Sequence, residues 1–262
     1  MKVKSGLIIS GIVLVAALGL YWALPSREPS AEELYRQYME LSPFEQFNNR
    51  DILLKKAAEK GYTPAILQMA NDNFINKKDL QSREYDFWIK KAADLGDPQG
   101  QLEAFNALDL PIEENFNYLL KAAGQSYGPA LWVLGRIYAS GDEDYHIVRD
   151  EQKALKLFRQ AADANMPEAL YLLYLLDRLN IFPLAESRQK EDIYQRYLEA
   201  AKKEGGTPYP SFNDIQELTP DQCRRISNFL QEYMKGEEKI ESIIQKLHEE
   251  MSRTRHDGHQ NS

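Results

Sequence analysis

A serine in the middle of the chain stands in a spacing that a catalytic nucleophile can use. The segment Gly124-Gln125-Ser126-Tyr127-Gly128 matches G-x-S-x-G, in which the serine sits on a sharp turn between a strand and a helix. Here a helical pattern enters the turn, and no alternating strand pattern exists to bring a base such as His146 beside the serine. We interpret the segment as a turn between helices and keep a serine hydrolase using Ser126 as the disfavoured alternative.

Metal and nucleotide sites have no matching motif. Cys223 is the single cysteine, and His256 and His259 lie in a polar C-terminal stretch. Neither H-E-x-x-H, C-x-x-C, a P-loop nor G-x-G-x-x-G occurs. The acidic run Gly141-Asp142-Glu143-Asp144 lacks the ligand periodicity of a calcium loop. The sequence therefore predicts a protein with no metal, no cofactor and no catalytic activity.

The formal net charge of -8 argues against nucleic acid as a partner, because nucleic-acid binding needs a clustered basic surface. A composition that is 43% hydrophobic and 27% charged is typical of a folded, helix-rich protein. With one cysteine, no disulfide can form within the chain. Packing must therefore supply the stability.

Residues 5–24 (SGLIISGIVLVAALGLYWAL) are uncharged and almost wholly apolar, which is the length that a helix needs to cross a membrane. Lys2 and Lys4 precede this segment, and Tyr21 and Trp22 lie near its far end. The positive-inside tendency then predicts a single-pass protein of a bacterial inner membrane whose body faces the periplasm. The alternative is a cleaved signal peptide, for which the segment is long and lacks a cleavage motif.

Internal repeats organise the rest of the chain. A six-residue pattern recurs four times: two adjacent large apolar residues, two further residues and two adjacent alanines. A weaker copy follows. The first alanines of the five copies are Ala57, Ala92, Ala122, Ala161 and Ala200, and successive ones are 35, 30, 39 and 39 residues apart. Each large residue precedes an alanine by four positions and therefore lies on the same face of the helix. The two pairs form two adjacent ridges, of which one can pack on the preceding helix and the other on the following helix. This pattern predicts interior helices of a stack.

Each of the four full copies is followed by the same stop signal. Four residues after the first alanine stand Gly61, Gly96, Ser126 and Asn165. Glycine and asparagine tolerate the left-handed conformation that ends a helix. A proline follows two or three residues later, where the first turn of a helix accepts it. The predicted unit is helix, turn, helix.

The segment from Ala130 to Gly141, followed by Asp150 to Ala154 and the pair Ala161-Ala162, resembles a full unit of the Sel1-like repeat (SLR) family. The resemblance covers roughly Ile52 to Gly205 and is partial in the units at 63–97 and 98–127. It implies a tetratricopeptide-like α-solenoid that acts as an adaptor. The fold class that we expect is therefore all-α: a right-handed α-solenoid of helix-turn-helix repeats, preceded by one N-terminal transmembrane helix.

Some units depart from the family pattern. The Leu-Gly pair of the first helix is replaced by Met69-Ala70 in one unit and by Leu173-Tyr174 in another. The third unit is short and has no glycine-rich loop. The binding surface of the family therefore cannot be carried over to particular residues.

Capping boxes mark three helix starts, at Ser30-x-x-Glu33, Ser42-x-x-Glu45 and Thr219-x-x-Gln222. A helical stretch is expected from about Pro220 to Met251, with an interruption near Gly236. The predicted parts are a cytoplasmic tail (1–4), a transmembrane anchor (5–24), a linker (25–30), a helical-repeat solenoid (31–205), C-terminal capping helices (206–252) and a flexible tail (253–262).

Aromatic residues with one arginine surround the best repeat, and Trp, Tyr and Arg are the types that make interface hot spots. We select Trp132, Arg136 and Tyr145 as candidate partner-binding residues, while Trp132 and Tyr138 also fit the core pattern of the repeat. The predicted function is capture of a protein partner at the membrane. Two forms stay open: an immunity protein that sequesters a secreted antibacterial toxin such as a lipase, or a scaffold for envelope assembly or signalling.

Overall fold

The structure is a computed structural model of the whole chain. It describes residues 28–41, 47–77, 83–178, 187–209, 219–233, 242–249 and 252. Within these ranges the secondary structure is helical apart from one isolated β-bridge between Asp142 and Ile147. The all-α prediction is therefore confirmed for the described part of the chain.

Contacts divide the chain into two compact units, Met1–Ala65 and Ile66–Ser262, each of which is described by itself. The first unit holds α2 (Ala31–Glu40) and α3 (Phe47–Glu59), which pack against each other. The division falls within α4 (Thr63–Lys77). The further helices are α5 (Arg83–Asp94), α6 (Pro98–Ala107), α7 (Ile112–Gly124), α8 (Gly128–Ser140), α9 (Glu151–Asp163), α10 (Pro167–Arg178), α11 (Ser187–Lys203) and α12 (Pro220–Tyr233).

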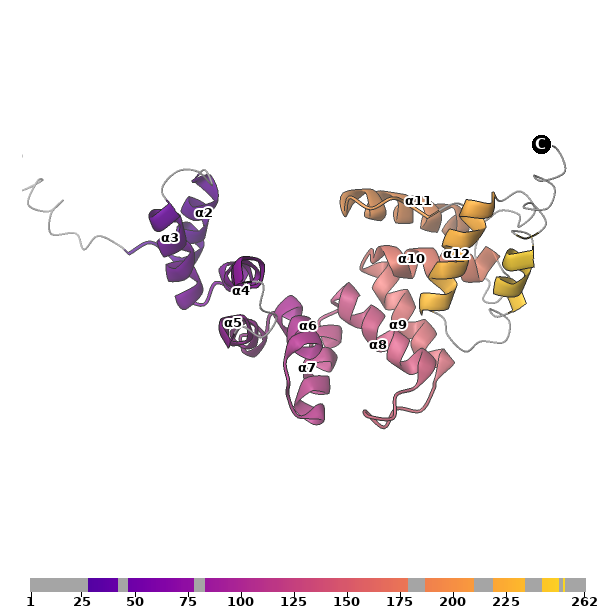
Figure 1. Cartoon of the computed structure of the whole chain (residues 1–262), viewed down its shortest axis with the longest axis horizontal. Helices are drawn as coiled ribbons and strands as arrows, with labels where there is room; N and C mark the ends of the chain where they lie inside the picture. The colour runs from indigo at the N-terminus through magenta and orange to yellow at the C-terminus, as the bar shows by residue number, and fades with distance from the viewer. Residues whose placement is uncertain are drawn as a thin grey trace, which may run out of the picture. The chain divides into compact units, whose positions relative to one another are not determined.

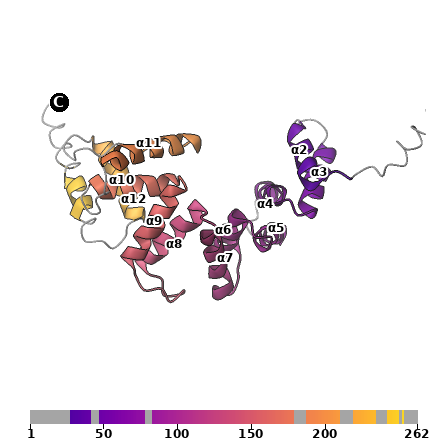
Figure 2. The same cartoon turned by 180° about the vertical axis from the view of Figure 1, so that it is seen from behind.

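In the second unit each helix from α5 to α10 packs against the next helix in the chain (Figure 1). Figure 2 shows the same succession from behind, with α6 beside α7 and α8 beside α9. Packing between neighbours in sequence is what a stack of helical repeats requires, because each repeat buries its apolar face on the next one. The solenoid prediction is thus confirmed for this unit.

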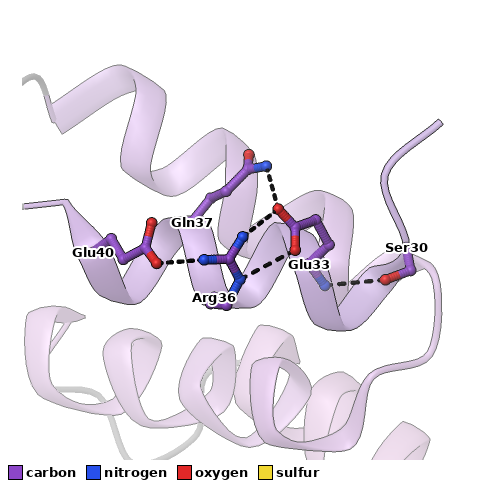
Figure 3. Close-up of polar contacts among 5 residues, drawn as sticks. All are labelled: Ser30, Glu33, Arg36, Gln37 and Glu40. Atoms are coloured by element: carbon purple, nitrogen blue, oxygen red, sulfur yellow. Dashed lines mark hydrogen bonds and ion pairs between the residues drawn. The ribbon is translucent and has the colours of Figure 1, made fainter. Parts of the chain in front are cut away.

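Helix α2 begins where the sequence predicts, at the cap formed by Ser30. Ser30 Oγ accepts a hydrogen bond from the backbone N–H of Glu33 at 3.1 Å (Figure 3). The Arg36 guanidinium donates to Glu33 at 2.6 Å and to Glu40 at 2.6 Å, and Gln37 also donates to Glu33. The hydrogen bond from Arg36 to Glu33, and after it the one from Gln37, lowers the pKa of the Glu33 carboxyl. The predicted box at residues 42–45 lies outside the described residues.

The four predicted helix stops all adopt the left-handed conformation. The φ angles of Gly61, Gly96, Ser126 and Asn165 are 87°, 89°, 59° and 59°. In each copy the N–H of the following residue donates to the carbonyl of the first alanine, as Tyr127 does to Ala122 at 3.3 Å. This is the Schellman arrangement, which satisfies carbonyl groups that the helix end would leave without donors. The stop signal is therefore confirmed.

The weaker fifth copy fits the same geometry in a shifted register. Gly205 has φ 74°, and the N–H of Gly206 donates to the carbonyl of Ala201 at 3.0 Å. Ala201, and not Ala200, thus occupies the position that Ala161 holds in the preceding copy. Ala201 is buried, whereas Ala200 is partly exposed. The assignment of Ala200 from the sequence is therefore wrong by one residue, because the stop residue four positions later is Gly205 only when Ala201 is the first alanine.

The repeated alanines lie in the core, as predicted. Both members of each of the four pairs are buried, and so are seven of the eight large residues four positions earlier, with Leu53 half-buried. Glycines permit equally close approaches: a Cβ on Gly100 would lie 2.6 Å from Cβ of Ala92. Alanine and glycine thus set the short distance between neighbouring helices.

The irregular units have local explanations. In the short third unit, α6 has 10 residues against 13 in α8, and the connection to α7 spans only residues 108–111. In α10, Tyr174 replaces the glycine and packs on Tyr194 of α11, with ring centroids 4.6 Å apart. The Tyr174 ring thus fills the space between α10 and α11, whereas the glycine at the same position of α8 lets α8 and α9 approach each other directly.

The C-terminal part covers α10 with aromatic side chains. Tyr171, which is fully buried, contacts Tyr197, Tyr209 and Phe229 with centroid distances of 4.8, 5.0 and 4.9 Å. Helix α12 begins at the predicted capping box, where Gln222 N–H donates to Thr219 Oγ1 at 3.3 Å and Thr219 N–H donates to Gln222 Oε1 at 2.9 Å. A further helical segment covers 242–249. The C-terminal residues thus close the apolar end of the stack.

Among the described residues no helix has the length and apolarity needed to cross a membrane. The predicted transmembrane segment at 5–24 lies outside these residues.

Candidate functional site

The three candidate partner-binding residues lie in different surroundings. Trp132 is 4% exposed and packs on Phe158 of α9 with ring centroids 4.9 Å apart, so its surface is used inside the repeat. Arg136, one turn later on α8, is exposed. Tyr145 is half-buried in the α8–α9 connection. Of the three, Arg136 presents the most surface to another protein.

Tyr145 holds the α8–α9 connection against the preceding hairpin. Its ring stacks on Phe116 of α7 with a centroid distance of 4.7 Å and lies 6.0 Å from the ring of Phe105. Its hydroxyl donates to Asn115 Oδ1 at 3.5 Å. Burial, followed by the charge of Asp142, raises the pKa of Tyr145. The residue therefore joins two repeats and exposes only part of its ring.

The structure does not place Ser126 as a nucleophile. It is exposed on the turn between α7 and α8, and its N–H donates to the carbonyl of Ala123 at 2.9 Å. A nucleophile elbow requires a strand before the serine, and a helix stands there instead. His146 is exposed in the α8–α9 connection. In the part of the chain that the structure describes, no three His, Cys, Asp or Glu side chains are grouped to hold a metal ion.

A groove of about 610 Å³ lies between α5 and the α6–α7 connection. Its apolar side chains include Phe87 and Leu95, which are 58% and 54% exposed, together with Leu108 and Leu110. Exposed apolar side chains that gather in a concave place mark interaction sites more often than single exposed ones do. We define these four residues as the α5 groove.

Charged side chains around the α5 groove are tied together by Lys90. Its ammonium donates to Tyr118 at 3.1 Å, to Glu114 at 3.3 Å and to Asp94 at 3.5 Å, and Tyr118 donates to Asp94 at 2.5 Å. The hydrogen bond with Tyr118, with further help from Glu114 and Asp94, holds the pKa of Lys90 above its usual range. Burial and the Asp94 carboxylate raise the pKa of Tyr118. This network fixes one wall of the groove.

Comparison between repeat copies gives only a weak sequence signal for the α5 groove. Leu95 stands three residues after the first alanine, where the other copies have Lys60, Gln125 and Ala164. Phe87 stands five residues before that alanine, where the other copies have Ile52, Asn117 and Lys156. Only Leu95 is therefore a large apolar residue at a position that is polar or small in every other copy.

Comparison with known proteins identifies the fold. No family model matches the chain, and no curated protein matches its sequence. A protective antigen present in uropathogenic Escherichia coli strains, which displays an SLR fold, is similar at 16% identity with a TM-score of 0.51, over 86% of this chain and 53% of that chain. This likeness shows that the chain has an SLR fold.

Two further solved structures are less similar in space. One is an immunity protein from Pseudomonas aeruginosa, at 20% identity and a TM-score of 0.47, over 88% of this chain and 84% of that chain. The other is a Sel1 repeat protein from Oxalobacter formigenes, at 21% identity and a TM-score of 0.46, over 61% and 65% of the two chains.

Proposed function

Because the described helices form an SLR fold, we propose that this chain is a non-catalytic module that captures a protein partner. The α5 groove is the observation that carries the proposal, since Phe87 and Leu95 each leave more than half of their surface uncovered beside Leu110. Association with another protein would remove this apolar surface from water. The transfer free energy gained is about 25 cal/mol per Å², before the costs of association are subtracted. The groove is therefore the first place to look for contact.

The same proposal places the module in the bacterial envelope. The apolar segment 5–24, preceded by Lys2 and Lys4, supports a single-pass anchor in the inner membrane with the helical body in the periplasm. A cleaved signal peptide would deliver the same body to the same compartment without the anchor. Fractionation of cells and the mass of the mature chain distinguish these two forms.

A narrower form of the proposal is that the partner is a secreted antibacterial toxin, such as a lipase, which the module sequesters as an immunity protein. This form depends on analogy with envelope-anchored SLR proteins, and the net charge of -8 suits a basic surface on the toxin. The alternative form is a scaffold for envelope assembly or signalling. Both forms use the same solenoid and differ in the partner.

Affinity capture with the full-length tagged chain, from the envelope and secreted fractions of its own bacterium, tests the proposal. Stoichiometric recovery of one secreted hydrolase that the chain then inhibits supports the immunity form. Recovery of inner-membrane assembly proteins without a toxin supports the scaffold form. If the chain recovers no protein at a fixed ratio under either condition, the binding function itself is wrong.

Matched charge variants test whether Arg136 belongs to the interface. Arg136→Glu changes an exposed cation on α8, and Lys156→Glu changes an exposed cation on α9. If Arg136 contacts the captured partner, its variant weakens binding about tenfold, which corresponds to a loss of about 1.4 kcal/mol of binding free energy. The Lys156 variant should bind as the unaltered chain does. Equal affinities for both variants would remove Arg136 from the interface.

A further inference from the structure

One lysine joins the chain before α2 to the end of α3. Lys60 lies in the turn that follows α3. Its ammonium donates to Glu28 Oε2 at 3.2 Å and to the carbonyl of Pro29 at 3.2 Å. These two hydrogen bonds, which we call the Lys60 latch, fold the chain before α2 back onto the C-terminal end of α3.

The turn that carries Lys60 is itself fixed by contacts. The N–H of Tyr62 donates to the carbonyl of the first alanine of this copy at 3.2 Å, and the ring of Tyr62 lies 5.3 Å from that of Tyr35 in α2, between centroids. The start of α2 and the end of α3 therefore form one end of the first unit. We call residues 28–36 and 55–62 the α2–α3 base.

Few residues separate this base from the apolar segment 5–24. Four Cα-to-Cα steps join Leu24 to Glu28, and an extended chain spans at most about 3.6 Å per residue, so the two lie at most about 14 Å apart. The headgroup layer on each side of a bilayer is about 5–8 Å thick. If segment 5–24 spans the membrane, the latched base therefore lies less than one helix diameter, about 10–12 Å, above the headgroups.

The charges of the α2–α3 base are balanced. Its four cations and four carboxylates are Arg36, Lys55, Lys56 and Lys60, and Glu28, Glu32, Glu33 and Glu59. Three ion pairs join members of the two sets, namely Arg36–Glu33, Lys55–Glu59 and Lys60–Glu28. Net charge thus neither draws the base to an anionic bilayer nor drives it away, and the length of the chain decides its distance from the membrane.

We propose that the α2–α3 base rests on the phospholipid headgroups of the membrane that holds segment 5–24, and that the Lys60 latch keeps it there. Without the latch, seven steps from Leu24 to Ala31 would allow a separation of about 25 Å. The latch thus nearly halves the reach of the linker. The inference rests on the membrane anchor of the proposed function and adds a lipid contact to the protein contact proposed there.

Headgroup quenching tests the contact on the full-length chain in nanodiscs of phosphatidylcholine. A fluorophore on Glu32→Cys, an exposed position in the first turn of α2, reports the base, and lipids with a nitroxide on the headgroup quench it at short range. The natural Cys223 is 1% exposed, and the chain without the new cysteine, labelled in the same way, gives the background.

A longer linker supplies the reference for this measurement. Twenty glycine and serine residues inserted after Leu24 change no described residue and spread over about 25 Å, so quenching should be about threefold weaker than with the natural linker. Equal quenching with the two linkers would overturn the inference, because the contact would not depend on the length of the chain.

Two lysine variants test the latch. Lys60→Gln removes the ammonium that holds Glu28 and Pro29, so the quenching in excess of the long-linker chain should fall about twofold, as loss of an exposed ion pair predicts. Lys55→Gln is the matched control, because the Lys55 partner Glu59 lies in the same helix. Quenching in this control should be unchanged, and equal quenching in both lysine variants would remove Lys60 from the mechanism.

Lipid charge and chain mass complete the test. Nanodiscs of phosphatidylglycerol should give the same quenching as those of phosphatidylcholine, and a strong difference would show that charge sets the contact. If cells retain segment 5–24 in the mature chain but the fluorophore is not quenched, the headgroup contact is wrong and the anchor stands. If the mature chain lacks the segment, the anchor and this inference both fail, and capture of a partner is unaffected.

Discussion

A Cβ atom on Gly135 would lie 2.6 Å from Cε1 of Phe158, so α8 and α9 pack through a position that admits no side chain. Phe158 is 2% exposed and also packs on Trp132, which leaves it little room to move. We predict that Gly135→Ala lowers the free energy of unfolding by about 1–3 kcal/mol, the usual cost of overpacking a core. Urea denaturation followed by far-UV circular dichroism measures this change.

Gly124→Ala is the matched control for that variant. Gly124 ends α7, and a Cβ there would meet no heavy atom within 4 Å. The free energy of unfolding should stay the same or rise by up to about 1 kcal/mol, because alanine is the better helix former. Equal losses in the two variants would show that the contact with Phe158 is not the cause.

Ser126 offers a substitution that should stabilise the fold. Its φ of 59° lies in the left-handed region, where a side chain costs about 1–2 kcal/mol that glycine avoids. Because glycine also loses more backbone entropy on folding, Ser126→Gly should raise the free energy of unfolding by no more than about 1 kcal/mol. Thermal unfolding measures the gain, and partner capture should be unaffected. Loss of an activity in this variant would instead support the hydrolase alternative.

Asn165 has the same φ but an additional role, so its glycine variant should behave differently. Arg196 of α11 donates to Asn165 Oδ1 at 2.9 Å and 3.3 Å and to the carbonyl of Ala162 at 2.7 Å. Asn165→Gly relieves the backbone but removes the two hydrogen bonds to Asn165, and a hydrogen bond contributes about 0.5–1.5 kcal/mol. We expect little net change in the thermal midpoint. A gain as large as that of Ser126→Gly would mean that the hydrogen bonds to Asn165 add nothing.

These turns show why so much of the repeat fold was predictable. Alanine pairs, left-handed stop residues and prolines all act within one or two helical turns, so their spacing reports local geometry directly. The register of Ala201 follows from the same spacing, because Gly205 stands four residues after Ala201, whereas Glu204 stands four residues after Ala200. The alanine pair alone does not distinguish the two registers, and the hydrogen bond from Gly206 to Ala201 confirms the second one.

The candidate site was harder to predict, because it depends on which face of each helix is covered. Trp132 has the residue type of a hot spot but lies against Phe158, whereas Phe87 and Leu95 resemble core residues and are exposed. Residue type and helical spacing fix a face, and the neighbouring helices decide whether that face is buried. The α5 groove further requires the α6–α7 connection, whose path no local pattern encodes.

Tyr145 should control the opening of the α8–α9 connection. Tyr145→Ala removes the ring that stacks on Phe116, an interaction of about 0.5–1.5 kcal/mol, so local opening should increase about two- to tenfold. Trypsin cleavage after Arg149, followed by mass spectrometry under native conditions, measures that opening. Tyr145→Phe keeps the ring and loses only the 3.5 Å hydrogen bond to Asn115, so its cleavage rate should match that of the unaltered chain. Equal cleavage of the alanine variant would show that the stack does not hold the connection.

The aromatic cluster over α10 should make the fold sensitive to alkaline pH. Burial raises the pKa of Tyr197 to about 12, and burial also raises the pKa of Tyr171 above its usual range. In the unfolded chain both hydroxyls ionise near pH 10. Since the folded-state pKa is the higher one, the stabilising contribution is complete below about pH 10 and is lost as pH rises toward 12.

The free energy of unfolding should therefore be nearly level between pH 7 and pH 9 as far as these tyrosines are concerned, and should fall above pH 10 by up to about 1.4 kcal/mol per pH unit for each of them. Denaturant titrations at successive pH values, with tyrosinate absorbance recorded in parallel, test the slope. Tyr197→Phe should reduce the slope in this window, while lowering stability at neutral pH because the hydroxyl accepts the N–H of Tyr209. An unchanged alkaline slope in that variant would mean that Tyr197 ionises as readily in the folded chain as in the unfolded one.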